Sequence, residues 1–213
     1  PIEHGDADFS PPGGMIMADR HDMDFTYSLI DRLFRQSLGE MADFRRAYFE
    51  GDYTLTLEEA QRRKHDFIVE QLEIAPGRRF LDMGCGWGPV LGRIREEGAT
   101  GVGVTLSRNQ AEACRRLGLD VHIRDCRTLE PGEIGNFDGV VSLGAFEHFC
   151  SIEEWRAGEQ DAIYGRLFRT VHDLLPPGGR FYLQTMVFGE NMVPFETIDI
   201  DAPRKSDGHV LAL

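Results

Sequence analysis

Apolar residues after position 77 gather in five short runs, at 80–83, 101–105, 120–123, 138–143 and 180–187. Longer segments at 88–97, 107–117 and 152–175 lie between these runs and have the length of helices. Parallel strands need crossover connections, so this alternation predicts an α/β fold with a doubly wound, mostly parallel sheet covered on both faces. Ligands of such sheets bind beyond the carboxyl ends of the strands, and we expect the functional site there.

Before position 77 the pattern is helical. Between 25 and 41, apolar residues recur at three- and four-residue intervals, which is the spacing of one helix face. Thr56 and Glu59 have the spacing of a capping box ahead of a helix at 60–72. The same spacing recurs at Ser107 with Gln110 and at Ser151 with Glu154. Residues 1–24 show no sustained period and are interpreted as an irregular leader.

Composition narrows the class of protein. The chain has 213 residues and a formal net charge of −13, which favours one compact domain and disfavours nucleic acid as a partner. Its uncharged runs are far shorter than the about 20 residues of a membrane span. The acidic N-terminus is unlike a secretory signal, and the four cysteines form no Cys-x-x-Cys pair. We therefore expect a cytoplasmic protein without a membrane span, a disulfide framework or a metal site.

The sharpest local signal is the run Leu81-Asp82-Met83-Gly84-Cys85-Gly86-Trp87-Gly88, between a predicted strand and a predicted helix. Glycines there let the backbone turn tightly and approach a ligand. The spacing departs from the dinucleotide fingerprint, and no acidic residue between Glu97 and Glu112 is placed to hold a ribose. Asp82 can meet a cationic amine, and hydroxyl and amide groups after the second strand can bind a ribose. This combination fits S-adenosylmethionine, which has no pyrophosphate.

Each of these residues also has a structural interpretation. The glycine loop is compatible with a tight turn in any doubly wound fold, and Ser107 with Gln110 can simply cap a helix. Asp125 is interpreted either as a partner of the adenine amine or as the start of a turn. Cys85 is expected to be a small buried filler.

Further runs stand in order with the glycine loop: AYFE at 47–50, LEEAQ at 57–61, VTLSRNQ at 104–110 and SLGAFEHF at 142–149. With these motifs the chain resembles the cyclopropane-fatty-acid and mycolic-acid cyclopropane synthase family of class I S-adenosylmethionine-dependent methyltransferases. We accordingly expect a single Rossmann-like methyltransferase domain at 25–213, with an N-terminal lid at 25–60 and a cofactor-binding core at 78–190.

Carried over by position, the resemblance implies a set of cofactor contacts at the ends of the first three strands. The methionine end would meet Asp82, Gly84, Cys85, Gly86, Trp87 and Gly88, the ribose would meet Thr105, Leu106, Ser107 and Gln110, and the adenine would lie between Asp125 and Cys126. The resemblance also implies that Glu147, with Gly144 nearby, holds a bicarbonate that removes a proton from a methylated carbocation. His148 is expected to be a core or supporting histidine.

An alkene is a weak nucleophile, so its methylation needs a positioned sulfonium, a dry apolar channel and a nearby base. Aromatic faces can stabilise the developing cation. Tyr48, Phe49, Phe146 and Phe149 are candidates for that role, although a place in the core is favoured for each of them.

Several positions differ from the family pattern. Phe44-Arg45-Arg46 stands in place of Tyr-Ser-Cys, Thr26-Tyr27-Ser28 in place of His-Tyr-Asp, and Gln184 in place of the fifth-strand histidine. These departures argue against bicarbonate, and Gln184 favours methyl addition over ring closure. The chain ends before a sixth and a seventh strand. We therefore expect either a trimmed part of a longer enzyme or an oligomer paired through the fifth-strand edge.

The leading hypothesis is a methyltransferase that acts on the double bond of an unsaturated acyl lipid, with Glu147, Gly144 and Gln184 in its catalytic site. One alternative is a small-molecule O-, N- or C-methyltransferase. Another is a non-catalytic protein that binds S-adenosylmethionine.

Overall fold

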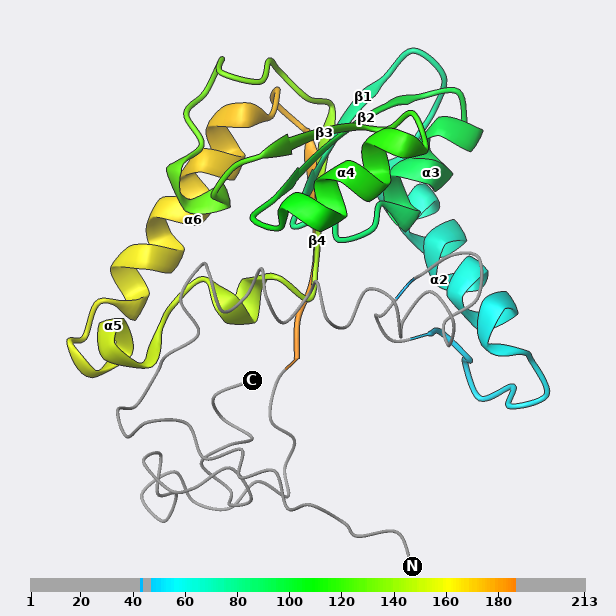
Figure 1. The fold of residues 1–213 in the computed structure, drawn as a ribbon, viewed down its shortest axis with the longest axis horizontal. Helices are drawn as coiled ribbons and strands as arrows, with labels where there is room; N and C mark the ends of the chain where they lie inside the picture. Colours follow the sequence, from blue (N-terminus) through cyan, green and yellow to red (C-terminus); the bar gives the residue numbers. More distant parts are fainter. Residues whose placement is uncertain (1–42, 44–46, 187–213) are drawn as a thin grey trace, which may run out of the picture.

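The computed structural model describes residues 43 and 47–186, which form a five-stranded sheet between helices (Figure 1). The strands are β1 (Arg79–Met83), β2 (Thr100–Thr105), β3 (Asp120–Ile123), β4 (Gly139–Leu143) and β5 (Arg180–Gln184). Their order is β3-β2-β1-β4-β5, and all neighbours are parallel. The strand order reverses between β1 and β4, which is where doubly wound sheets bind ligands.

Helices cover both faces of the sheet (Figure 1). One face is covered by α2 (Leu57–Leu72), α3 (Pro89–Glu96) and α4 (Arg108–Arg116), and the other by α6 (Gln160–Leu174). Two 3-10 turns, η1 (Cys126–Thr128) and η2 (Phe146–His148), follow β3 and β4, and the short helix α5 (Ile152–Arg156) comes next. The predicted α/β class is confirmed.

Side-chain alternation along β1 divides the hydrophobic core in two. Phe80 packs in the cluster that contains Ile68 of α2 and Ile94 of α3, whereas Leu81 packs in the cluster that contains Leu167 of α6. Successive strand residues point to opposite faces, so a strand covered on both sides must be apolar at nearly every position. This requirement explains the unbroken apolar runs in the sequence.

Capping residues set two of the helix starts as expected. The Glu59 amide donates to the Thr56 hydroxyl (3.2 Å), and the Thr56 amide donates to the Glu59 carboxylate (2.8 Å). Ser151 and Glu154 form the same reciprocal pair ahead of α5, at 3.2 and 2.9 Å. Each pair satisfies backbone donors that a helix start leaves without partners.

Most predicted elements lie within a residue of their observed bounds, with three corrections. The helix predicted at 60–72 begins at Leu57, directly after its cap Thr56. The single helix predicted at 152–175 is wrong, because α5 and α6 are separated by Gly158, whose φ of 75° ends the first helix. The strand predicted at 180–187 ends at Gln184. The predicted leader at 1–24, the predicted helix at 25–41 and the chain after 186 lie outside the described residues.

At one edge of the described sheet, β5 is tied to the end of α2. The Arg180 guanidinium donates to the Gln71 carbonyl (2.7 Å) and pairs with the Glu73 carboxylate (2.5 Å). Pairing of this edge with a second chain stays a prediction. No helix within residues 43 and 47–186 is both long and apolar enough to cross a membrane.

Candidate functional site

The glycine loop makes its turn directly after β1. Gly84, Gly86 and Gly88 have φ values of 85°, 57° and 82°, in the left-handed region that favours glycine. The amides of Gly84 and Cys85 donate to the Val104 carbonyl at 2.9 and 3.0 Å, so the loop is held against the end of β2. A Cβ on Gly84 would lie 2.5 Å from the Cβ of Ala145. The loop therefore touches the turn after β4, and any side chain at Gly84 would clash with Ala145.

The other loop residues pack inward. Cys85 is fully buried and packs against Gly103 of β2. A Cβ on Gly103 would lie 2.7 Å from the Cys85 Sγ. This confirms the interpretation of Cys85 as a filler. Trp87 is also buried. Sequence reasoning did not identify Cys114 of α4, whose thiol donates to the Gly86 carbonyl (3.4 Å) and links that helix to the loop.

Asp82 is fully buried near the end of β1, beside Gly103 of β2 and Val141 of β4. Burial and the charges of Asp125 and Asp82 together raise the pKa of the Cys126 thiol to about 12. Cys126 is therefore a neutral thiol at physiological pH. The electrostatic effect of Asp82 on Cys126 indicates that the ends of β1 and β3 share one negative environment, which suits a cationic ligand.

The polar residues after β2 bond to one another. The Thr105 hydroxyl donates to the Gln110 side-chain oxygen (2.7 Å), and it accepts from the Ser107 amide (3.2 Å). The Gln110 amide donates to the Ser107 hydroxyl (3.4 Å), so Ser107 caps α4. The predicted reciprocal capping box is wrong, because the Gln110 side chain bonds to Thr105 instead. Leu106 is half-buried between these residues, and ribose binding here stays a prediction.

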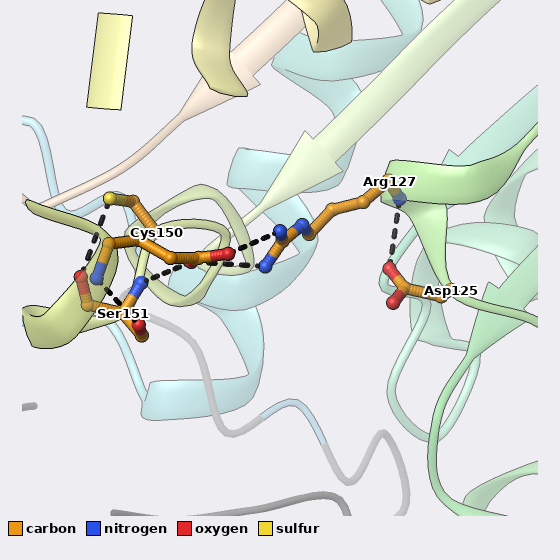
Figure 2. Close-up of polar contacts among 5 residues, drawn as sticks. Asp125, Arg127, Cys150 and Ser151 are labelled. Atoms are coloured by element: carbon orange, nitrogen blue, oxygen red, sulfur yellow. Dashed lines mark hydrogen bonds and ion pairs between the residues drawn. The ribbon is translucent and has the colours of Figure 1, made fainter. Parts of the chain in front are cut away.

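The end of β3 is organised by Asp125 and Arg127 (Figure 2). The Asp125 carboxylate accepts from the Arg127 amide (2.9 Å) and begins η1, as the turn interpretation requires. The Arg127 guanidinium makes two bonds to Glu154, at 2.6 and 3.2 Å. Glu154 also accepts from the Ser151 amide. Sequence reasoning did not identify this link between η1 and the start of α5.

A cavity of about 340 Å³ lies beside Asp125, between η1 and α6. The residues that line it come from η1 and its cap, from α6, and from the end of η2. They are Asp125, Arg127, Thr128, Phe149, Ile163, Arg166 and Leu167. Asp125 thus faces open space as well as capping η1, so the adenine interpretation of this residue also stays a prediction.

The turn after β4 carries Glu147 to the end of β5. Gly144, with a φ of 58°, donates its amide to the Gln184 carbonyl (2.9 Å), and the chain then enters η2. The Glu147 carboxylate accepts a hydrogen bond from the Thr185 hydroxyl (2.9 Å). Gly144, Glu147 and Gln184 therefore lie at the same place in the fold, and their catalytic role stays a prediction. Thr185 was missed, and the only available signal was its position next to Gln184.

The aromatic candidates separate into two groups. Phe146 packs on Tyr164 of α6, with ring centroids 4.3 Å apart, and Phe149 is buried beside it. Tyr48 packs instead on Phe67 of α2 (5.7 Å). Phe149 is thus a core residue, and the contacts of Phe146 are with the core. His148 is exposed, so its placement in the core is wrong: the 3-10 turn points it to solvent.

Comparison with known proteins gives one consistent family. Residues 16–197 match the model of the mycolic acid cyclopropane synthetase family. Cyclopropane mycolic acid synthase 2 of Mycobacterium leprae is 36% identical over 172 residues, which cover 76% of this chain and 54% of the relative. The chain thus spans about half the length of the curated relatives that it matches.

Solved structures agree with this result. Mycolic acid cyclopropane synthase CmaA1, complexed with SAH and CTAB, is 32% identical with a TM-score of 0.60, over 76% of this chain and 55% of that one. The cyclopropane synthase MmaA2 from Mycobacterium tuberculosis is 31% identical with a TM-score of 0.66, over 81% and 58%.

Proposed function

The chain belongs to the mycolic acid cyclopropane synthetase family, and on that premise we propose that it transfers a methyl group from S-adenosylmethionine to the double bond of an unsaturated acyl lipid. The observation that carries the proposal is the contact between the glycine loop at Gly84 and the turn at Ala145, two residues before Glu147. A methyl donor in the loop and a carboxylate on the turn would share one reaction space.

The residues at the strand ends fit this cofactor. When bound, S-adenosylmethionine supplies an activated methyl group on a positively charged sulfur. The buried Asp82 carboxylate provides a negative charge for the cationic end of the ligand. The three glycines carry no side chain, and Cys85 and Trp87 between them are buried, so backbone groups of the loop can approach the ligand. SAH in the related synthase CmaA1 supports the same class of ligand.

Glu147 supplies the carboxylate that methylation of an alkene requires. When the alkene π electrons form the new bond to the methyl carbon, the methyl–sulfur bond breaks and leaves its electron pair on sulfur. The other alkene carbon then becomes cationic, and a carbon bonded to it must lose a proton. A carboxylate close to that carbon stabilises the cation and can accept the proton. Loss of the proton from the added methyl group closes a cyclopropane ring, and loss from the adjacent chain carbon leaves a methyl-branched alkene.

We propose the branched product over ring closure. Gln184, at the end of β5, occupies the position of the family histidine, and its amide is not a base at neutral pH. The second departure, at Phe44-Arg45-Arg46, lies outside the described residues. Glu147 alone then supplies the acceptor, and bicarbonate is not required. The lid proposed for 25–60 lies largely outside the described residues as well.

A labelled-methyl assay tests the proposal. Incubation with methyl-labelled S-adenosylmethionine and unsaturated phospholipid should place the label in the acyl chain. Glu147→Gln should abolish turnover while the cofactor Kd changes by less than about tenfold, or about 1.4 kcal/mol. Glu153→Gln, on the exposed start of α5, is the matched control and should keep full activity.

Three results would contradict the proposal. Label found only in water-soluble products would indicate a small-molecule methyltransferase. Undiminished turnover in Glu147→Gln would remove that carboxylate from the reaction. Calorimetry that detects binding of NAD and no binding of S-adenosylmethionine would reject the cofactor itself.

A further inference from the structure

Thr185 lies immediately after β5 and contacts the candidate catalytic carboxylate. Its hydroxyl oxygen lies 2.9 Å from Glu147 Oε2, and both side chains are partly buried. A hydroxyl can donate to a carboxylate, whereas an ionised carboxylate has no proton to give, so the direction of this bond is set. Glu147 therefore has one oxygen held by a neighbouring strand end.

The backbone brings the two residues together. Leu143 of β4 pairs in register with Gln184 of β5, and the next amide along β4, that of Gly144, donates to the Gln184 carbonyl (2.9 Å). The η2 turn then folds Glu147 back over the end of β5. Strand pairing thus places Thr185 opposite the turn, and the hydroxyl meets the carboxylate without any adjustment of the sheet.

This contact matters because a glutamate side chain has three rotatable bonds. Hydrogen bonds to charged groups are about twice as strong as those between neutral groups, so one such bond can select a single rotamer. With Oε2 held by Thr185, the other oxygen, Oε1, has a defined direction. A base that is held in place before the reaction avoids the cost of ordering it during the reaction.

We propose that Thr185 is a positioning residue that orients Glu147 toward the methylated carbon. The proposal rests on the proposed function of Glu147 and deepens it. Its prediction is specific: removal of the hydroxyl should lower kcat and leave cofactor binding intact, because Thr185 acts on the carboxylate alone.

The test compares Thr185→Val, which has nearly the same shape without the hydroxyl, with Thr185→Ser, which keeps the hydroxyl. Thr185→Val should lower kcat about tenfold with the KM for S-adenosylmethionine within about twofold, and Thr185→Ser should recover most of the activity. Thr170→Val on α6 is the matched control for a threonine-to-valine change and should behave as wild type.

A second readout does not need activity. The 13C NMR resonance of the Glu147 carboxyl is assigned by its loss in Glu147→Gln. That resonance should move in Thr185→Val and stay in place in Thr185→Ser and Thr170→Val. An unchanged kcat, or a resonance that stays in place in Thr185→Val, would overturn the positioning role.

Failure of the proposed function gives a different result. If the wild-type protein methylates a water-soluble acceptor and no lipid, the proposed substrate is wrong. A tenfold lower kcat of Thr185→Val on that acceptor, with the moved resonance, would still support the positioning role. If the protein methylates lipid and Thr185→Val is indistinguishable from wild type, the substrate stands and the positioning role falls.

Discussion

At the residue scale, Gly84 combines two constraints. Its φ of 85° disfavours any residue with a Cβ, and the space for that Cβ is taken by Ala145. The first constraint is common to many turns in this chain. The second is shared with Gly88, whose Cβ would lie 2.6 Å from Leu119, but at Gly84 the neighbour belongs to the turn that carries Glu147.

Substitution of Gly84 should therefore cost more than substitution of a left-handed glycine with open space around it. Gly77→Ala, at a φ of 80° with nothing within 4 Å, should lower the free energy of unfolding by about 1–2 kcal/mol. Gly84→Ala should add about 1–3 kcal/mol for the clash and weaken S-adenosylmethionine binding. Thermal unfolding and calorimetry measure both quantities. Equal losses in the two variants would contradict the prediction, and Ala145→Gly should partly rescue Gly84→Ala.

Cys126 predicts a pH dependence of stability. Its pKa in the folded protein is about 12, against a reference value of 9.0, because burial and the charges of Asp125 and Asp82 disfavour the thiolate. Between these values the folded state keeps the proton that the unfolded state loses. The thiol should therefore lower the free energy of unfolding by about 1.4 kcal/mol per pH unit across that window.

The measurement is denaturant unfolding of the wild type and Cys126→Ala between pH 8 and the alkaline limit of the fold. The difference in free energy of unfolding between wild type and variant should change little near pH 8, and the wild type should lose stability relative to the variant above pH 9. Parallel pH curves for the two proteins would show that the Cys126 thiol does not titrate differently on folding.

At the element scale, the Arg127–Glu154 pair joins η1 to α5 (Figure 2). The hydrogen bond from Arg127, followed by the Ser151 amide bond, lowers the pKa of Glu154. Glu154 thus serves both the capping box of α5 and the link to the end of β3. The pair stabilises the connection between the predicted adenine end and the segment that follows Glu147.

Glu154→Gln separates these two roles, because glutamine at this position can still complete a capping box. Loss of the charge should lower the free energy of unfolding by about 1 kcal/mol at neutral pH, the upper end of the range for surface pairs, because both side chains keep only about a third of their exposure or less. The difference from wild type should shrink as the pH falls below the reference value of 4.5, where Glu154 becomes protonated.

Glu96→Gln is the matched control for Glu154→Gln. Glu96 pairs with Arg62 at 3.4 Å with over half of each side chain exposed, so its loss should cost less than about 0.5 kcal/mol. Equal effects in the two variants, measured by urea unfolding, would show that the Arg127–Glu154 link contributes no more than a surface pair.

At the scale of the whole molecule, a buried ion cluster ties the segment before α2 to the core. The Asp43 carboxylate accepts from the Lys64 ammonium (2.6 Å) and bonds to His65 (2.9 Å), and all three side chains are almost fully buried. Burial alone would raise the pKa of Asp43, but the bonds from His65 and Lys64 lower it below its reference value. Removal of one partner would leave a buried charge, so the cluster holds Asp43 firmly against α2.

The arrangement of the whole sheet also brings the site together. The order β3-β2-β1-β4-β5 places the carboxyl ends of β1 and β4 side by side, although Leu143 lies 60 positions after Met83 along the chain. The Ser142 hydroxyl donates to the Met83 carbonyl (3.0 Å) and strengthens this meeting. The glycine loop and the turn that carries Glu147 therefore lie together at the carboxyl ends of the strands.

The sequence by itself determined the class of fold, because strand and helix periods are local and two-sided burial requires unbroken apolar runs at β1 and β4. It also determined the glycine loop, two of the three predicted capping boxes and the family. Gly158 shows the limit of reasoning from periodicity: the pattern at 152–175 has one helical period, but the left-handed conformation of Gly158, with a φ of 75°, divides it into α5 and α6.

Tertiary structure decided the contacts between elements. Three contacts join segments that follow different strands: Thr185 with Glu147, Arg127 with Glu154, and Ala145 with Gly84. The spacing of residues in the sequence does not show which of these segments meet. The Gln110 side chain bonds to the Thr105 hydroxyl at the end of β2, and not to the Ser107 amide that a capping box would use. Hydrogen bonds and clashes depend on distances of a few ångströms, which strand pairing and helix packing set only when the whole sheet has formed.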